Sequence, residues 1–370
     1  MNLPCCGVAE APDEAKLMLT GRYSPSRALL FLALALVSPA AASPVEDALG
    51  PAPRGGDGRF MNFAGHMPEV GVSVTLPFFV RRIASSFTDT PSALDRVPND
   101  GAWLRENAKH SEPTVTWIGH ATLLVQMGHL TFLTDPIWSD RASPLSFAGP
   151  QRIVEPGVAI DDLPPIDFVV VSHNHYDHLD LASLIALSER DPNTRFFVPL
   201  ENGKLLRDNG VENVEELDWG QSVELGGVRV YCLPAQHWSK RGIGDDREAL
   251  WSSWAVLAPE RRFFFAGDTG YFDGFARIEE ALGPFDLAAV PIGAYEPAEM
   301  MKASHMNPEE AVQAAIDLRA RAAVAMHYGT FKLSDEPLDE PAKHFKKAAT
   351  ESALGDEAGW LLRIGETRAF

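Results

Sequence analysis

The stretch Ser172-His173-Asn174-His175-Tyr176-Asp177-His178 is the most informative part of this chain. It places three imidazoles and one carboxylate within six residues, directly after the apolar run 168–171. Imidazole nitrogens and carboxylate oxygens are the ligands that zinc binds when thiolates are absent. The stretch therefore predicts a metal site at the end of a buried strand.

The spacing within this stretch indicates two metal ions rather than one. Side chains at i and i+2 of an extended segment point to the same side, so His173 and His175 can bind a first ion together. Apolar residues with helical spacing over 181–187 predict a helix that begins near Asp180, and the turn into it would direct the last two ligands elsewhere. The alternative is a solvated histidine-rich loop with incidental metal affinity, which the preceding buried strand and the following N-cap disfavour.

Three more ligand-type residues occupy the same position relative to apolar runs. His237 follows the run 228–233, and Asp268 and His327 each follow another such run. Taken singly, each is more often a hydrogen-bonded structural residue. Four segments that all end in ligand-type residues favour a single site at one edge of a sheet.

From residue 114 onward, short apolar runs alternate with turn residues and helical patterns. Strands are expected at 115–118, 122–125, 130–133, 168–171, 195–198, 228–233, 254–257, 262–266, 287–290 and 322–326. Helices are expected near 180–190, 200–209, 274–282, 308–320 and 339–350. This order fits a mixed α/β sandwich with sheets inside and helices outside.

Together these residues resemble the hallmark of the metallo-β-lactamase superfamily, which is His-x-His-x-Asp-His after a strand, then a distant His, a Gly-Asp and a final His. Other motifs are similar to its N-acyl-phosphatidylethanolamine phospholipase D branch. They are Trp117-Ile118-Gly119-His120-Ala121-Thr122, Thr134-Asp135-Pro136, Gln236-His237-Trp238-Ser239-Lys240-Arg241-Gly242, His305-Met306-Asn307-Pro308-Glu309-Glu310 and His327-Tyr328-Gly329-Thr330-Phe331. The resemblance covers roughly residues 100–345.

The resemblance implies an αββα sandwich that holds two zinc ions per chain. It assigns His173, His175 and His237 to the first ion, Asp177, His178 and His327 to the second, and Asp268 to a bridging position. Two adjacent cations lower the pKa of a water molecule between them, so that a hydroxide nucleophile forms at neutral pH. Among the ligands, Asp177 and Asp268 would also be catalytic.

His305 is the third residue expected to be catalytic. The resemblance places it beside the metals, where it could orient the substrate or protonate the leaving alkoxide. The alternative is a histidine that merely precedes a helix, because Asn307-Pro308 has the pattern of an N-cap followed by proline. Asp135 and His120 are expected to support the ligands by hydrogen bonding.

Residues 1–42 are expected to form a signal peptide. An apolar core over 28–37 follows Arg22 and Arg27 and precedes Ala40-Ala41-Ala42. The acidic residues among the first 17 positions indicate that translation starts at Met18. Export by the general secretory route to the periplasm or envelope of a bacterium is therefore expected, with an uncleaved anchor as the alternative.

Four segments are expected in all: the signal peptide, a flexible linker over 43–60, an N-terminal arm over 61–100 and a catalytic domain over 101–370. The apolar part of the arm, residues 70–83, ends in Arg81-Arg82. It would either pack on the enzyme or contact lipid, with Phe78 and Phe79 inserted and the two arginines near headgroups.

Composition limits the partners. The chain has 45% hydrophobic and 22% charged residues, as in ordinary globular proteins, and a formal net charge of −19 that removal of residues 1–42 leaves unchanged. Such a surface disfavours nucleic-acid binding. Cys232 would be the only cysteine after processing, so no internal disulfide is expected.

These features favour a zinc-dependent phosphodiester hydrolase that acts on N-acyl-phosphatidylethanolamine-type lipids. In this acidic protein, Lys240 and Arg241 would bind the anionic phosphodiester, and Trp238, Tyr295, Trp251 and Trp254 could shape the pocket. A lactonase or other acyl hydrolase with the same metals is one alternative, and a non-catalytic zinc-containing envelope protein is another. The resemblance also implies a homodimer at a membrane surface.

Overall fold

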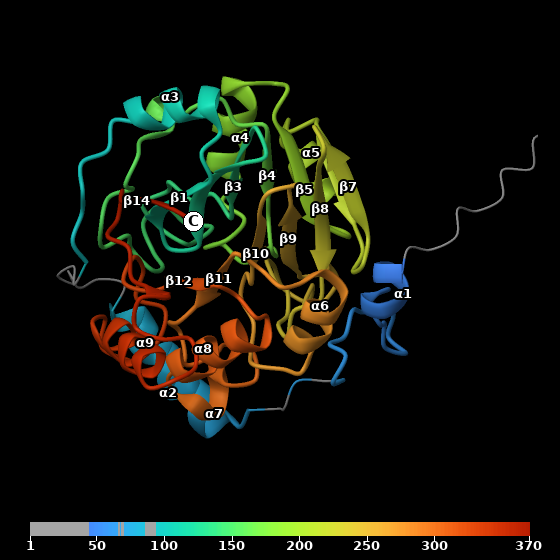
Figure 1. The fold of residues 1–370 in the computed structure, drawn as a ribbon. Helices are drawn as coiled ribbons and strands as arrows, with labels where there is room; N and C mark the ends of the chain where they lie inside the picture. Colours follow the sequence, from blue (N-terminus) through green and yellow to red (C-terminus); the bar gives the residue numbers. More distant parts are fainter. Residues whose placement is uncertain (1–43, 66, 68–69, 86–93) are drawn as a thin grey trace, which may run out of the picture. The chain divides into compact units, whose positions relative to one another are not determined.

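The computed structural model describes residues 44–65, 67, 70–85 and 94–370, with backbone only at 83–85. The expected signal peptide, with its cleavage site and alternative start, lies outside these residues. Two mixed sheets form the centre of the described part, and helices cover their outer faces (Figure 1). This is the predicted α/β sandwich.

The first sheet has the strand order β14-β1-β2-β3-β4-β5-β6. Its strands are β1 (Thr114–Gly119), β2 (Thr122–Met127), β3 (Leu130–Thr134), β4 (Phe168–Val170), β5 (Arg195–Pro199), β6 (Val214–Leu217) and β14 (Thr367–Ala369). The strands from β3 to β6 are parallel, whereas β1, β2 and β3 pair antiparallel.

The second sheet has the order β13-β12-β11-β10-β9-β8-β7. Its strands are β7 (Ser222–Leu225), β8 (Val228–Leu233), β9 (Ser253–Leu257), β10 (Arg262–Phe265), β11 (Leu287–Pro291), β12 (Ala322–Met326) and β13 (Gly359–Trp360). The strands from β10 to β13 are parallel. Parallel strands bring their carboxyl ends to one edge, which is where ligands bind in such sheets.

The helices of the described residues flank the sheets. They are α1 (Pro44–Leu49), α2 (Val72–Ser85), α3 (Ala102–His110), α4 (Leu181–Arg190), α5 (Gly203–Arg207), α6 (Gly274–Leu282), α7 (Ala298–Met301), α8 (Pro308–Asp317) and α9 (Glu340–Thr350), with a 3-10 turn at Ile160–Asp162. None of these has both the length and the apolar character that a membrane span requires.

Alternation along single strands builds two apolar layers. Phe132 of β3 points between the sheets, where its ring stacks on Phe168 of β4 at 4.6 Å and meets Phe263 of β10 at 5.8 Å. Its neighbour Leu133 points to the opposite side and joins Leu184 of α4 in a second core. Successive strand side chains face opposite ways, so one strand serves both layers.

The strands that sequence reasoning missed lie at sheet edges. β6 is Val-Glu-Glu-Leu with only its last residue buried, and β14 is Thr-Arg-Ala with none buried. Because edge strands need no continuous apolar run, their sequences lack the pattern that predicted the central strands.

The segment expected as a flexible linker is ordered in the structure. Residues 44–49 form α1, and Leu49 and Phe60 are fully buried in the main core. Residues 72–85, expected as an apolar arm without a stated conformation, form the helix α2 with Pro77 inside it. Apolar residues of the first segment are buried in the core, and those of α2 lie partly on one helix face. The Pro- and Gly-rich composition of the first segment hides this pattern in the sequence.

Candidate metal centre

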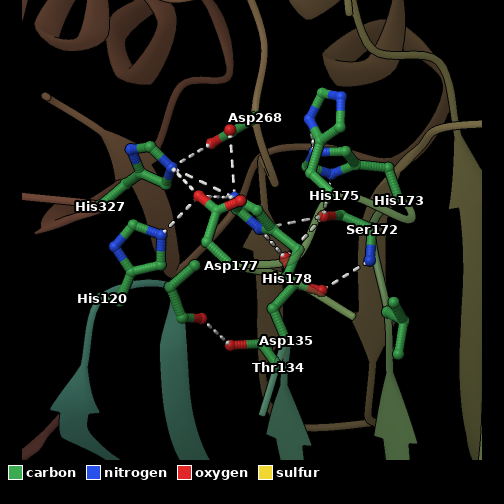
Figure 2. Close-up of polar contacts among 12 residues, drawn as sticks. His120, Thr134, Asp135, Ser172, His173, His175, Asp177, His178, Asp268 and His327 are labelled. Carbon is green, nitrogen blue, oxygen red and sulfur yellow. Dashed lines mark hydrogen bonds and ion pairs between the residues drawn. The ribbon is translucent and has the colours of Figure 1, made fainter. Parts of the chain in front are cut away.

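The predicted ligands come together where the strands end. His173 follows β4, Asp268 follows β10 and His327 follows β12, and their side chains converge in Figure 2. All seven ligands named from the sequence belong to clusters whose donor atoms lie within 4.8 Å of one another. The structure thus assembles residues that are up to 154 positions apart in the chain, such as His173 and His327.

The first group consists of His173, His175 and His237. His175 Nδ1 lies 2.8 Å from His173 Nε2 and 3.3 Å from His237 Nε2. His237 is reached from β8, in the other sheet, so this group joins the two halves of the sandwich. The i, i+2 relationship predicted for His173 and His175 is present.

The second group contains Asp177, His178 and His327. His178 Nε2 and His327 Nε2 are 3.1 Å apart, and each is 3.3 Å from Asp177 Oδ2. His178 and His327 are buried, whereas the Asp177 side chain is 14% exposed. This group is therefore the one with a carboxylate open to the solvent side.

Asp268 lies between the two groups. Its Oδ2 is 3.1 Å from His178 Nε2 and 3.9 Å from His237 Nε2, and its Oδ1 is 3.1 Å from His327 Nε2. A carboxylate that has donor atoms of both groups within 4 Å is suited to bridging two cations.

Hydrogen bonds behind the imidazoles fix which nitrogen faces inward. His237 Nδ1 donates to the carbonyl oxygen of Ser304 at 2.9 Å, which leaves an unprotonated Nε2 in the site. His173 Nδ1 lies 2.9 Å from Ser172 Oγ, whose own proton goes to Asp135 Oδ2 at 2.5 Å. Such partners determine the tautomer of metal-binding histidines.

The Nε2 atoms of His173 and His237 therefore present lone pairs, and they lie 2.8 and 3.3 Å from His175 Nδ1. Such an arrangement is repulsive unless a proton or a cation lies between the donors. Nitrogen and oxygen donors without thiolate are suited to zinc. The residues present thus fit a metal site, and the structure brings together the residues that the sequence named as ligands.

The charges of the two groups differ. Burial holds the pKa values of His173 and His237 well below their usual range. Burial also opposes protonation of His178 and His327, but Asp268 and Asp177 outweigh it, raising the pKa of His178 well above its usual value and that of His327 to about 9. The second group therefore carries protons in the metal-free protein at pH 7.

His120 supports the second group, as the sequence suggested. Its Nε2 donates to Asp177 Oδ2 at 2.9 Å, and its ring lies 4.1 Å from that of His327. Its carbonyl oxygen also accepts the backbone N–H of His327 at 3.0 Å. Burial lowers the pKa of His120 to about 3, so the neutral ring orients Asp177 through one hydrogen bond.

His305 lies beside the cluster. Its Nδ1 is 3.8 Å from Asp268 Oδ2, and its ring is 5.1 Å from His237. Asn307 is the N-cap of α8, with a capping box to Glu310 and proline at N1, so the helix-start interpretation of the motif is also correct. Burial lowers the pKa of His305 to about 4, which makes it neutral at pH 7.

Arg241 does not reach toward the site as expected. Its Nη1 donates to the carbonyl oxygens of Asn174 and Leu179 at 3.0 and 2.9 Å, and its guanidinium lies 4.1 Å from the Tyr176 ring centre. Tyr176 in turn donates to the carbonyl of Arg241 at 2.9 Å. The arginine ties the ligand stretch to the loop of His237, because its guanidinium satisfies buried carbonyls.

The suggested pocket aromatics separate into two kinds. Trp238 lies edge-on to His175 with ring centres 4.6 Å apart, so it borders the site. Trp251 and Trp254 belong to the main core instead, and Tyr295 donates to Glu340 at 2.8 Å. The large indoles of Trp251 and Trp254 fill space in the main core, so these two residues do not line the pocket.

The sequence did not reveal three residues that orient the ligands: Ser304, Ser172 and Asn62. The Ser304 carbonyl that orients His237 has no residue-type signature, since any residue could supply it. Ser172 could have been recognised, because it stands next to His173 and follows the strand directly. Asn62, which bonds to the backbone of His237, had no pattern to mark it.

Comparison with known proteins agrees with this geometry. The model of the β-lactamase superfamily domain matches residues 131–328. N-acyl-phosphatidylethanolamine-hydrolyzing phospholipase D 1 of Caenorhabditis elegans is 48% identical over 236 residues, which are 60% of this chain and 66% of that protein. The chain thus spans slightly less than two thirds of the length of this relative.

Two further comparisons cover nearly the whole of the other protein. The UPF0173 metal-dependent hydrolase MK1542 of Methanopyrus kandleri is 30% identical over 257 residues, 68% of this chain and 98% of that protein. The solved structure of Igni18, a metallo hydrolase from Ignicoccus hospitalis, has a TM-score of 0.53 at 24% identity and covers 70% of this chain and 98% of that one. The latter likeness concerns the fold.

Proposed function

The chain belongs to the metallo-β-lactamase superfamily. We propose that it is a dinuclear zinc hydrolase that cleaves phosphodiesters of the N-acyl-phosphatidylethanolamine type. The observation that carries the proposal is the convergence of seven ligand-type residues in two groups with Asp268 between them. The named activity of the nematode relative supports the substrate class.

Zinc ions held by the two groups would supply Lewis acidity toward a phosphoryl oxygen and make a nucleophile from water at neutral pH. His173, His175 and His237 would hold one ion, and Asp177, His178 and His327 the other. Asp268 would hold both and keep their separation fixed, with Asp135 and Ser172 beneath them. Held ligands need no reorganisation during the reaction, which favours catalysis.

In the proposed reaction, water adds to phosphorus, and the bond between phosphorus and the headgroup oxygen breaks. Phosphatidic acid and an N-acylethanolamine result, and the leaving oxygen takes a proton. His305, neutral at pH 7, is better suited to orienting the substrate with one hydrogen bond than to serving as a strong acid. Its catalytic role and those of Asp177 and Asp268 are part of this proposal.

The anionic phosphate needs a cation in this acidic protein. Because Arg241 is committed to backbone carbonyls, Lys240 is the remaining candidate of the pair. Lys240 is exposed, and no hydrogen bond or ion pair to it occurs among the described residues. We therefore assign the phosphate contact to Lys240 alone.

The test is incubation of the zinc-loaded protein with N-acyl-phosphatidylethanolamine and identification of the products by mass spectrometry. His327→Ala, which removes one ligand, is the control. Paired release of phosphatidic acid and N-acylethanolamine by the wild type alone is expected. Absence of turnover with two zinc ions bound would contradict the lipid proposal and direct the assay to lactones, and absence of bound zinc would contradict the metal centre.

We also propose that α2 contacts lipid, with a changed set of residues. Val72, Leu76, Phe79 and Val80 share one helix face and are each more than half exposed. Phe78, expected to insert, is buried, and Arg81 and Arg82 form ion pairs with Asp335. Leu76→Glu with Phe79→Glu should abolish sedimentation with phosphatidylcholine vesicles, whereas Trp103→Glu on α3 should not.

Export to a bacterial periplasm or envelope, and assembly into a homodimer, complete the proposal. The first rests on the apolar core over 28–37, outside the described residues. The second rests on the resemblance to the phospholipase D branch. N-terminal sequencing of the secreted protein tests export, with a mature start at residue 43 expected. Light scattering of the purified protein tests the homodimer.

A further inference from the structure

A short N-terminal segment lies against the loop that carries His237. We call residues 52–63 the strap, and residues 234–248 the His237 loop. No helix or strand is assigned between Leu233 and Ser253, so secondary structure does not hold the His237 loop in place. The other six ligands lie in residues 173–178, after β4, or shortly after β10 and β12. The position of His237 therefore depends on contacts from elsewhere.

Asn62 of the strap makes the central contact. Its Nδ2 donates to the carbonyl oxygen of His237 at 2.9 Å, and its Oδ1 accepts the backbone N–H of His237 at 3.1 Å. The same Oδ1 accepts Trp251 Nε1 at 3.0 Å. Asn62 is 3% exposed, so these bonds are made away from solvent and are costly to leave unmade. The amide thus pairs with the main chain of the ligand itself and is anchored to the core by the indole.

The strap is fastened to the same loop at a second place. Phe60, which is fully buried, donates its N–H to the carbonyl of Arg247 at 2.9 Å. Arg59 donates to the carbonyl of Gly244 at 2.6 Å and forms an ion pair with Asp246 at 3.1 Å. Two contacts at opposite ends of the loop restrict it more than either does alone.

From these contacts we infer that Asn62 is a positioning residue of the metal centre, and that the strap completes the centre by fixing the backbone of His237. The inference rests on the metal centre proposed above. The imidazole of His237 is held at one side by the Ser304 carbonyl, and its main chain is held by Asn62. Metal ligands need placement within about half an ångström, which supporting contacts of this kind provide.

A positioning role for Asn62 differs from ordinary packing in its effect on the two ions. Loss of Asn62 should weaken zinc at the His173–His175–His237 group and leave the second group, which has no contact with the strap among the described residues, nearly unchanged. A residue that only stabilises the fold would instead affect both ions equally, through the fraction of unfolded protein.

The experiment measures zinc release to a chromogenic chelator from the full-length, two-zinc protein. Asn62→Ala removes all three bonds, and Asn62→Asp keeps the acceptor but places an oxygen against the His237 carbonyl. Asn107→Ala is the matched control, because Asn107 is 4% exposed and bonds to Glu112, Thr114 and Gln126 away from the site. Arg59→Ala loosens the strap from its more exposed end and serves if the Asn62 variants fold poorly.

One of the two zinc ions should leave about 10- to 100-fold faster from both Asn62 variants, as is typical when a supporting partner is lost. Hydrogen exchange should rise in peptides that cover residues 234–248, and Asn107→Ala should show neither change. Equal release from the Asn62 variants and from Asn107→Ala would overturn the inference. A wild type that binds no zinc would refute the metal centre itself and, with it, the inference.

Discussion

Asp135 Oδ2 accepts a hydrogen bond from His178 Nδ1 at 2.6 Å, and both side chains are completely buried. The same oxygen accepts the proton of Ser172 Oγ, which lies against His173. One carboxylate beneath the centre therefore orients a ligand of each metal group. This relationship makes the pair of groups a single unit, although each is built from different segments.

Asp135→Asn should weaken the binding of both ions. The amide oxygen would keep the bond from the Ser172 N–H, so the NH2 group would face His178 and force its proton onto Nε2, the nitrogen that should bind metal. We expect a 10- to 100-fold loss of zinc affinity, measured by competition with a chelator. Asp180→Asn, a buried carboxylate that bonds Ser139 and Ser183, should retain zinc; equal losses in both would contradict this role.

Zinc affinity of the second group should rise with pH up to about 9. Metal displaces protons, and His327 has its pKa raised to about 9 by Asp268 and Asp177 against the effect of burial. The first group, kept neutral by burial, should bind without proton release near pH 7. Calorimetry in buffers of different ionisation enthalpy counts the released protons, and release at both sites or at neither would contradict this difference.

The metal-free protein should show the opposite trend in stability. A histidine whose folded-state pKa is raised stabilises the fold fully below its unfolded value of about 6.5, and that contribution disappears as pH rises through the folded value. For His327 the window runs from about pH 6.5 to about 9. Thermal unfolding of the zinc-free chain should therefore occur at lower temperature at pH 9 than at pH 7, and His327→Gln should reduce this difference.

Arg241→Ala should lower stability rather than substrate affinity. The change leaves the carbonyls of Asn174 and Leu179 without a charged donor, and a bond of that kind contributes about 1.5–3 kcal/mol. Denaturant unfolding should show a loss of about 2–4 kcal/mol with nearly unchanged KM in the folded protein. A large rise in KM at full stability would instead restore Arg241 to the phosphate contact.

Lys240→Ala should have the complementary effect. With its ammonium exposed and unbonded within the described part of the chain, its loss removes a charge contact to the phosphate and nothing structural. KM for the phosphodiester should rise about tenfold, because a contact to a charged group contributes roughly 1.5 kcal/mol, with zinc content unchanged. Lys204→Ala, an exposed lysine on α5 that pairs with Asp208, should leave KM as it is.

The central strands and the residue types of the site follow from the amino-acid sequence alone. Runs such as 168–171 and 322–326 must be buried whatever surrounds them, and ligand-type residues directly after such runs have to meet at the rim of a sheet. The family hallmark can also be read from the sequence. Four of its ligands lie within residues 173–178, and the other three follow in a set order along the chain. Those features depend on short-range pattern and chemistry.

The partners that complete the site become apparent only in the folded chain. From the sequence, Arg241 could bind either the substrate or backbone carbonyls. In the folded chain Tyr176 packs against its guanidinium and holds it on the backbone. Asn62 sits in a segment whose composition resembles a linker, yet its amide bonds to His237, 175 positions away. The physical reason is that hydrogen bonds to main-chain atoms carry no residue signature, so they become visible only when the folded chain brings both groups together.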